Sequence, residues 1–348
     1  MRSRLYTLAK GLFGTPTNAA LTLAMLGFAA WVLPPFWRWA IEYATWEAPN
    51  RTGCAAGGAC WAFVSSRFRM FLVGRYPWEE AWRPALALVL LVGLVSVALS
   101  GGRRSGTALA LLVVGLPPVA GALLLGGVFG LAPVSTGDWG GLMLNVVLCF
   151  LAVILALPLG VVLAFGRQSE APITRALSIG FVEFWRGVPL LAVLFMGLVM
   201  LPLFLPHGVT LDNLIRAQVV LTLFTSAYMA EVVRGGILGV PRGQGEAAAA
   251  LGFSDWQVKQ MVILPQALRR CIAGVINIVV DLFKDTTLVS IVGLFDLMGV
   301  ITQSLRDRDW LGMASEGYVF AALVFFVCCL VMSIAGSRVE KRLNAGIR

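Results

Sequence analysis

The sequence predicts an all-α integral membrane protein with about eight transmembrane helices, and three observations lead to this fold class. Of its 348 residues, 59% are hydrophobic and only 13% are charged, whereas soluble domains contain about 45–50% apolar and about 25% charged residues. The mean hydropathy is +0.85. Apolar runs of about 20 residues, the length that crosses the hydrocarbon core of a bilayer as a helix, recur along the chain.

Eight apolar runs account for most of the chain, and no polar interval between them is long enough to form a soluble domain. The second run is short, and the seventh is interrupted by Lys284 and Asp285. The runs lie near residues 17–40, 84–100, 107–129, 141–166, 176–205, 217–239, 271–300 and 316–336.

The distribution of Lys and Arg near the ends of the runs predicts the orientation of the chain. Arg2, Arg4 and Lys10 precede the first run without an acidic residue, so the start is expected in the cytoplasm. Eight spans then place the polar stretch 240–270 and the C-terminus on the same side, so both termini are cytoplasmic. The net charge of +9 is explained by this bias, and it predicts a chain surrounded by membrane lipid with no nucleic-acid partner.

The six cysteines divide by location. Cys54 and Cys60 lie in the predicted outer loop 41–83, where an oxidising compartment permits a disulfide; the alternative is two free thiols in a mobile loop. No histidine is nearby, so a metal site is not expected there. The other four lie in or at predicted spans, where a small apolar role is the usual one: Cys149, Cys271, Cys328 and Cys329.

Several catalytic motifs are missing from the sequence. The only histidine is His207, which excludes the HExxH zinc motif, and no lysine completes the GxxxxGK[ST] loop that cradles nucleotide phosphates. The chain is therefore predicted to be no enzyme, with no cofactor or metal of its own. Any dependence on ATP has to come from a partner subunit.

The stretch 240–270 predicts two short helices joined by a tight turn on the cytoplasmic side. Glu246 begins the run EAAAAL of strong helix formers, and Gly252 follows as a stop signal. Ser254 and Gln257 have the spacing of a capping box, in which the serine hydroxyl accepts a backbone N–H and the glutamine side chain reaches back.

The second of these helices is expected to end at Leu264–Pro265, because proline lacks the N–H that continues a helix. The first helix is nearly all alanine, so another surface could approach it closely. We interpret the pair as a docking element; the alternative is a structured loop packed on its own protein.

These residues resemble the EAA signature of ABC importer permeases. Glu246-Ala247-Ala248, Gly252, Val262 and Leu264-Pro265 match it, with Val262 where the family usually has Ile. The surrounding stretches "AYMAEVVRGGILGVPRGQGEAA", "VILPQALRR", "LFKDTTLVSIVGLFDL" and "FVEFWRGVPLL" are similar to the polar amino-acid branch of that family, from about residue 135 to 343. The first 130 residues, with "GGACWAF" and "RYPWEEAWRP", resemble the larger permease of general L-amino acid transporters.

The resemblance implies a type I importer fold with a five-helix core at 131–348. An N-terminal extension, 1–130, adds three transmembrane helices and the periplasmic loop 41–83. The cytoplasmic coupling loop 240–270 is expected to sit in a groove of a separate ATPase. The residues expected to carry this coupling are Glu246, Ala247, Ala248, Leu251, Gly252, Leu264 and Pro265.

The same resemblance implies the partners. They are a second homologous permease subunit, giving a heterodimer, two ATP-binding subunits that hold ATP and Mg, and a periplasmic amino-acid-binding protein. The assembly is expected in the bacterial inner membrane and to work by alternating access. Outer segments near 130–140, 206–216 and 303–316 are expected to meet the binding protein.

Ionisable residues inside spans are costly in lipid and are candidates for a substrate path. Three pairs share the i, i+3 spacing that places both members on one helix face: Glu183/Arg186, Glu231/Arg234 and Asp281/Lys284. The alternative is that each pair only neutralises itself. An uncharged stripe could line a path or hold helices together. The path candidates are Glu183, Arg186, Thr222, Thr225, Ser226, Glu231, Asn277, Asp281, Lys284 and Asp285.

The function predicted from the sequence is therefore the permease subunit of an ATP-driven amino-acid importer. The alternative is an ion- or proton-coupled secondary amino-acid carrier, which needs no ATPase, and a structural membrane scaffold is a third hypothesis. The capped cytoplasmic helix pair argues against the secondary carrier, because such a carrier has no motor to contact.

Overall fold

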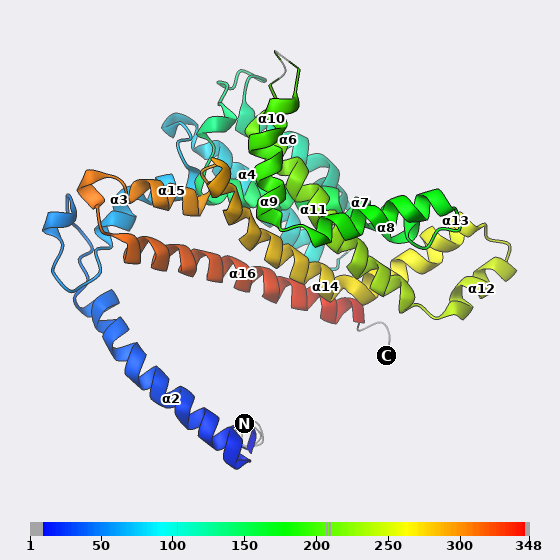
Figure 1. The fold of residues 1–348 in the computed structure, drawn as a ribbon, viewed down its shortest axis with the longest axis horizontal. Coiled ribbons are helices and arrows are strands. Elements are labelled where there is room, and N and C mark those ends of the chain that lie inside the picture. The colour runs from blue at the N-terminus through cyan, green and yellow to red at the C-terminus, as the bar shows by residue number, and fades with distance from the viewer. Residues whose placement is uncertain (1–9, 103, 207, 209, 345–348) are drawn as a thin grey trace. The chain divides into compact units, whose positions relative to one another are not determined.

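The computed structural model describes residues 10–102, 104–206, 208 and 210–344. The expectations on Arg2, Arg4 and His207 lie outside the described residues. Within these ranges the chain is helical, and β-pairing is confined to isolated bridges (Figure 1).

The α-helices follow one another from the N-terminal to the C-terminal end of the described chain. They are α2 (Pro16–Trp37), α3 (Ala62–Val73), α4 (Trp82–Leu99), α5 (Ser105–Ala110), α6 (Leu116–Leu125), α7 (Gly141–Gly166), α8 (Pro172–Gly187), α9 (Leu190–Phe195), α10 (Leu201–Phe204), α11 (Asn213–Leu238), α12 (Arg242–Ala250), α13 (Asp255–Gln257), α14 (Leu264–Asp285), α15 (Leu297–Ser304) and α16 (Ala314–Asn344).

Shorter helical segments of other types continue or connect these helices. The π-helical segments are η1 (Arg38–Glu42), η4 (Leu111–Gly115), η6 (Met196–Met200) and η7 (Val258–Ile263). The 3₁₀ segments are η2 (Arg51–Gly53), η3 (Trp78–Glu80), η5 (Thr136–Asp138), η8 (Thr286–Val292) and η9 (Arg308–Trp310).

Five helices in the described chain are long and apolar enough to cross a membrane, or six if one bent pair is counted as a span. The expected number of eight is therefore not confirmed. The bent pair joins Pro172–Gly187 to Leu190–Phe204 at an angle of 100°. The five spans are Pro16–Glu42, Trp78–Leu99, Ser105–Leu125, Gly141–Gly166 and Ala314–Leu343.

The difference in number comes largely from α11 and α14, which have the length of a span but are more polar. The first carries Arg216, Glu231 and Arg234, and the second carries charges at both ends. A polar face is tolerated in a membrane helix when it meets the inside of a bundle or an aqueous cavity rather than lipid. Mean hydropathy therefore undercounts such helices.

The expected seventh run, 271–300, is not one continuous helix. The α-helix α14 ends at Asp285, η8 continues it as a 3₁₀ segment to Val292, and Gly293 then takes a left-handed conformation with φ of 92°. A second break lies between α8 and α9, where Val188 is extended. The residue before a proline avoids the α conformation for steric reasons, and Pro189 follows it.

The chain divides into two compact units by its internal contacts. Unit 1 consists of residues up to Phe68 together with Ser304–Phe320, and unit 2 consists of Arg69–Gln303 together with the residues from Ala321 onward. The predicted boundary near residue 130, which concerns the limit of the permease core, stays a prediction.

In unit 1, a disulfide closes the loop that follows α2 and η1. It joins Cys54 and Cys60, whose Cα atoms are 5.6 Å apart. The backbone N–H of Cys60 donates to Glu316 Oε1 (3.0 Å), which ties this loop to the first turn of α16. Arg67 on α3 pairs with Asp307. The loop is therefore a folded part of unit 1.

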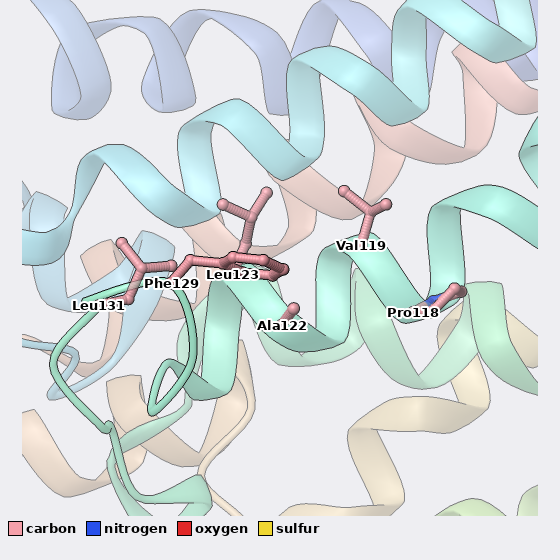
Figure 2. A pocket seen from close by; sticks show the side chains of 6 residues that line it. All are labelled: Pro118, Val119, Ala122, Leu123, Phe129 and Leu131. Carbon is pink, nitrogen blue, oxygen red and sulfur yellow. The ribbon is translucent and has the colours of Figure 1, made fainter.

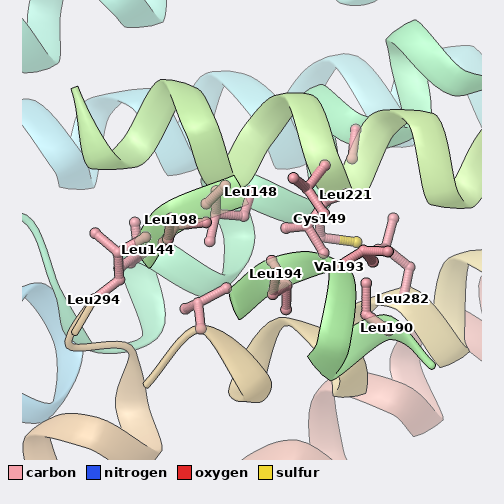
Figure 3. Packing of buried hydrophobic residues seen from close by; sticks show 14 of the residues in the cluster. Leu144, Leu148, Cys149, Leu190, Val193, Leu194, Leu198, Leu221, Leu282 and Leu294 are labelled. Atoms are coloured by element: carbon pink, nitrogen blue, oxygen red, sulfur yellow. The ribbon is translucent and has the colours of Figure 1, made fainter. Parts of the chain in front are cut away.

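The core of unit 2 is built from α7, α9, α11, α14 and η8 (Figure 3). Leu148, Leu194 and Leu221 have no exposed surface at its centre. Because lipid tails are as apolar as leucine, close packing between helices, rather than exclusion of water, stabilises such a core in a membrane.

The most extensive contact between two helices of unit 2 is that of α7 with α11. Ala152, Ala156, Gly160 and Ala164 recur every fourth residue of α7 and are all buried. A Cβ added at Gly160 would lie 2.6 Å from the Cβ of Met229 on α11. This stripe of small residues is what lets the two backbones approach, as expected for membrane helices.

A shallow groove of about 290 Å³ lies beside α6 and the loop that follows it (Figure 2). Phe129, which has a positive φ of 53°, is held over it by a glycine-rich loop. The lining is apolar and offers no hydrogen-bonding side chain to a ligand. Its residues are Pro118, Val119, Ala122, Leu123, Phe129 and Leu131.

Candidate functional site

The polar stretch after α11 folds into a helix, a turn and a second helix, as predicted. Pro241 precedes α12, and Gly252 forms the turn with φ of +85°. The predicted capping box is present: the N–H of Gln257 donates to Ser254 Oγ (3.4 Å), and the N–H of Ser254 donates to Gln257 Oε1 (2.8 Å). In Figure 1 the stretch lies at the end of unit 2 where α11 and α14 meet it.

One face of α12 packs back on the chain, and the other is exposed. Ala248 is buried, and Val258 at the start of η7 is buried against the same side. Glu246 and Ala247 are exposed. Leu251 at the turn exposes 79% of its surface. The two interpretations of this element, docking and self-packing, therefore apply to opposite faces of one helix.

The expected end of the second helix at Leu264–Pro265 is wrong. The chain stays helical from Asp255 through η7 into α14, which begins at Leu264. Pro265 falls in the first turn of α14, after the wider π-helical turn of η7. A proline is tolerated at the first turn of an α-helix, because its missing N–H needs no partner there. The turn at Gly252 is thus joined rigidly to α14.

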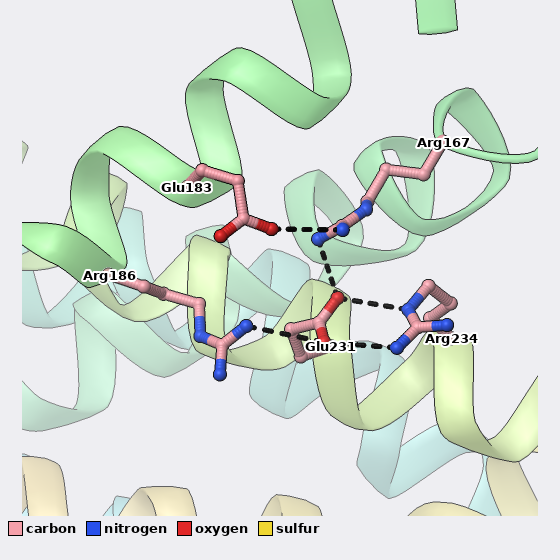
Figure 4. A network of polar contacts seen from close by, with 5 residues as sticks. All are labelled: Arg167, Glu183, Arg186, Glu231 and Arg234. Atoms are coloured by element: carbon pink, nitrogen blue, oxygen red, sulfur yellow. Dashed lines mark hydrogen bonds and ion pairs between the residues drawn. The ribbon is translucent and has the colours of Figure 1, made fainter.

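A network of ion pairs connects α7, α8 and α11 in unit 2 (Figure 4). Glu231 on α11 is its centre and accepts from three arginines. Arg167 Nη1 lies 2.6 Å from Glu231 Oε1, Arg186 Nη1 lies 3.2 Å from Oε2, and Arg234 Nε lies 3.0 Å from Oε1. Glu183 Oε1 on α8 accepts from the other Nη of Arg167 at 3.0 Å.

The pairs predicted from i, i+3 spacing are only partly the pairs that form. Glu231 and Arg234 do pair, but Arg186 pairs with Glu231 across helices rather than with Glu183. Arg167, which joins the two carboxylates, was not predicted as a site residue. The signal that could have identified Arg167 is its position directly after α7, because a residue at the C-cap lies beside the start of the next helix.

The second half of α14, toward η8, carries exposed polar side chains along one face. Asp281 and Lys284 pair at 2.8 Å, with 66% and 54% of their side chains exposed. Asn277 lies one turn earlier and is also exposed, whereas Asp285 is half-buried. Within the described chain Asp281 and Lys284 balance each other's charge and still remain largely exposed. This face is therefore the candidate lining of an aqueous path.

The uncharged stripe on α11 is arranged differently. Thr222, Thr225 and Ser226 are buried, and Ser226 Oγ donates to the carbonyl of Leu223 in its own helix (2.7 Å). Gln218 Nε2 donates to Thr222 Oγ1 (3.2 Å). This placement favours the interpretation as contact between helices over the interpretation as a path lining.

A polar cluster that sequence reasoning missed lies at the start of α7. Asn145 Nδ2 donates to Thr286 Oγ1 (2.8 Å) and to Asp296 Oδ2 (3.0 Å). No periodicity marked Asn145, which stands alone in an apolar helix. Its partners lie 141 and 151 residues further along the chain.

Comparison with known proteins assigns the chain to a family. Residues 156–345 match the family described as the binding-protein-dependent transport system inner membrane component. This match covers more than half of the 348 residues. The chain therefore belongs to this family.

Individual relatives extend the likeness to the N-terminal part. The chain is 46% identical to the inner membrane amino-acid ABC transporter permease protein YhdY of Escherichia coli (strain K12), over 97% of this chain and 92% of that protein. It is 35% identical to the glutamate/glutamine/aspartate/asparagine transport system permease protein BztC of Rhodobacter capsulatus, over 96% of this chain and 92% of that protein.

A solved structure supports the fold of the permease core. The crystal structure of an amino acid ABC transporter with histidines is 31% identical, covers 58% of this chain and 92% of that chain, and superposes with a TM-score of 0.51. The predicted resemblance to ABC importer permeases and the predicted fold class are confirmed by these likenesses, apart from the number of spans.

Proposed function

We propose that this chain is the permease subunit of an ATP-driven amino-acid importer and that α12 with its turn docks on a separate ATPase. The observation that carries the proposal is the exposed face of α12. It presents Glu246, Ala247 and Leu251 outward, while Ala248 anchors the helix from behind. An exposed leucine at the tip of a capped turn is expected to be covered by a partner.

The partners follow from the family. Its description includes a binding protein, and the relatives are named as ABC transporter permeases. We propose two ATP-binding subunits that hold ATP and Mg, a periplasmic amino-acid-binding protein and a second homologous permease in a heterodimer. The chain would lie in the inner membrane with both termini in the cytoplasm.

The path is proposed to run along the exposed polar face of α14. Asn277, Asp281 and Lys284 there offer both signs of charge and an amide to a zwitterionic substrate. A zwitterion crossing lipid alone would lose the hydration of two charges at great cost. The second permease would cover this face, which makes it the wall of a shared cavity.

The coupling element also has the stiffness that the proposed role needs. Helical structure runs from Asp255 through η7 to the end of α14 without a non-helical break. Motion imposed at the turn by closure of the ATP-binding subunits would therefore reach Asp281 and Lys284 on the same helical rod. This connection is the physical basis of the proposed alternating access.

The test uses Gly252→Ala in the complex reconstituted with its ATP-binding subunits and binding protein. An added Cβ meets no atom within 4 Å, so the effect isolates the strain of φ +85°. Left-handed backbone costs an L-residue about 1–2 kcal/mol, so we expect ATP hydrolysis stimulated by the binding protein to fall about fivefold or more. Glu246→Gln should lower the same rate by weakening the contact.

Gly245→Ala is the matched control, because Gly245 lies on the face of α12 that packs against η7, and its added Cβ would meet Val258 at 3.7 Å and Ile263 at 3.8 Å, which are ordinary contact distances. It should leave coupled hydrolysis at the wild-type rate. Unchanged coupling in both Gly252→Ala and Glu246→Gln would count against the proposal. Uptake that persists without ATP and without the ATP-binding subunits would instead favour the secondary carrier.

A further inference from the structure

Three segments of unit 2 that are far apart in the sequence meet at a fully buried polar cluster. Asn145 lies in the second turn of α7, Thr286 begins η8, and Asp296 directly precedes α15. All three residues have 0% exposed surface. Buried polar groups of this kind strongly determine a single arrangement, because any partner removed leaves another group unpaired.

Each hydrogen-bonding group of the Asn145 side-chain amide has a partner. Its two N–H donors go to Thr286 Oγ1 (2.8 Å) and Asp296 Oδ2 (3.0 Å). Its oxygen accepts the backbone N–H of Leu297 (3.1 Å). Asp296 Oδ1 in turn accepts the N–H of Gly299 (2.9 Å) and so caps the start of α15. One side chain of α7 thus holds both η8 and α15.

The segment that Asn145 holds is a weak element by itself. η8 has 7 residues in 3₁₀ conformation, whereas runs longer than about 3–4 residues are uncommon because their hydrogen bonds have poorer geometry. Its place therefore depends on tertiary contacts. Thr286 follows directly after Asp285, so the bond from Asn145 is made two residues beyond Lys284.

We infer that Asn145 is a positioning residue for transport. It holds η8 and the start of α15 against α7, and so fixes the end of α14 that presents Asp281 and Lys284 to the path. The inference rests on the proposed function, in which this face of α14 lines the path. Asn145 is itself buried and acts on the substrate only through the placement of that pair.

The test exchanges the two partners. Asn145→Asp places a second carboxylate oxygen opposite Asp296 Oδ2, where two buried carboxylates cannot both be ionised. Asp296→Asn places amide donors opposite each other. The double variant Asn145→Asp/Asp296→Asn restores one carboxylate and one amide with their positions exchanged, and the amide at 296 can still cap α15 through its oxygen. The Thr286 hydroxyl, which loses the N–H of residue 145, can turn from the carbonyl of Phe283 and donate to the new carboxylate.

The measurement is amino-acid uptake per ATP hydrolysed in the reconstituted complex with its binding protein. If Asp281 and Lys284 are displaced from the path, the ATP-binding subunits hydrolyse ATP without delivering substrate. Each single variant should lower this ratio about tenfold. The double variant should return to within about threefold of the wild type, because the two sites are directly coupled. A merely destabilised complex would lose uptake and hydrolysis together and keep the ratio.

Cys149→Ala is the control on the same helix. Cys149 lies one turn after Asn145, is buried, and its thiol donates to the carbonyl of Val279 on α14 (3.8 Å). This variant should keep the wild-type ratio. A double variant no better than the worse single variant, or singles that keep the ratio, would overturn the inference. If the wild-type complex shows no ATP-dependent uptake, the proposed function fails, and the inference fails with it.

Discussion

Glu231 shows at the scale of one residue how a carboxylate is accommodated in this bundle. It lies in α11, and its oxygens accept from Arg167, Arg186 and Arg234 on three different helices (Figure 4). Hydrogen bonds between ionised partners are about twice as strong as neutral ones. One side chain therefore links α7, α8 and α11, beside the non-helical break at Val188.

Replacing Glu231 by Gln keeps the size of the side chain and removes its charge. Arg167 then keeps its ion pair with Glu183, whereas Arg186 and Arg234 lose the carboxylate that they contact. We expect a loss of about 1–3 kcal/mol in the free energy of unfolding, because partly buried donors lose their ionic acceptor. Thermal unfolding of the purified complex measures the change, and uptake should fall with it.

Two other acidic residues serve as references for this prediction. Glu170→Gln changes an exposed carboxylate that has no ion pair among the described residues, and it should leave the unfolding temperature unchanged. The shift in unfolding temperature of Glu183→Gln should lie between those of Glu231→Gln and Glu170→Gln, since Glu183 contacts Arg167 alone and exposes 59% of its side chain. Equal shifts for Glu231→Gln and Glu170→Gln would contradict the assigned role of the network.

At the scale of elements, the turn between α12 and α13 depends on a few local interactions. Ser254 and Gln257 form the capping box that starts the helical rod ending at Asp285. The cap is worth about 1 kcal/mol in typical helices. Its role here is to fix the angle at which the rod meets α12, since little else covers the exposed turn.

Ser254→Ala should loosen this turn without altering the core. We expect faster amide hydrogen exchange at residues 253–258 by about fivefold, corresponding to a lost cap of about 1 kcal/mol. Exchange in 271–285 should be unchanged, because that part of α14 packs in the core of unit 2. Ser254→Thr keeps a capping hydroxyl and should restore protection. Equal exchange in the alanine variant and the wild type would show that the cap does not hold the turn.

At the scale of the whole molecule, the basic residues near span ends predict which parts lie on which side of the membrane. Unit 1 contains the disulfide between Cys54 and Cys60, which agrees with an oxidising compartment for its loop. The turn at Gly252 is expected on the opposite side, in the cytoplasm.

Labelling with a membrane-impermeant maleimide tests this orientation. Trp46→Cys should react in intact cells, and Leu251→Cys only after the membrane is permeabilised. Both positions are largely exposed in the isolated chain, with 60% and 79% of their surface accessible. When the chain is produced without the ATP-binding subunits that are proposed to cover Leu251, access to the reagent is decided by the side of the membrane. The unmodified chain gives the background. Reaction of Leu251→Cys in intact cells would reverse the proposed topology.

The local features were the most predictable part of the fold and the site. The helix at EAAAAL, the turn at Gly252 and the capping box at Ser254 depend on residues within a few positions of one another. Apolar runs likewise predicted the five clear spans. The continuation past Pro265 was missed, because a π-helical turn before it is not marked by any residue pattern.

By itself, the sequence determined that this is a multi-span α-helical membrane protein with a capped turn, since composition, apolar run length and capping all act over short distances. Only the tertiary structure decided that Arg167 joins Glu183 to Glu231, and that Asn145 holds Thr286 and Asp296. Such partners are chosen by how helices far apart in the chain pack together. Spacing within one helix carries no information about them.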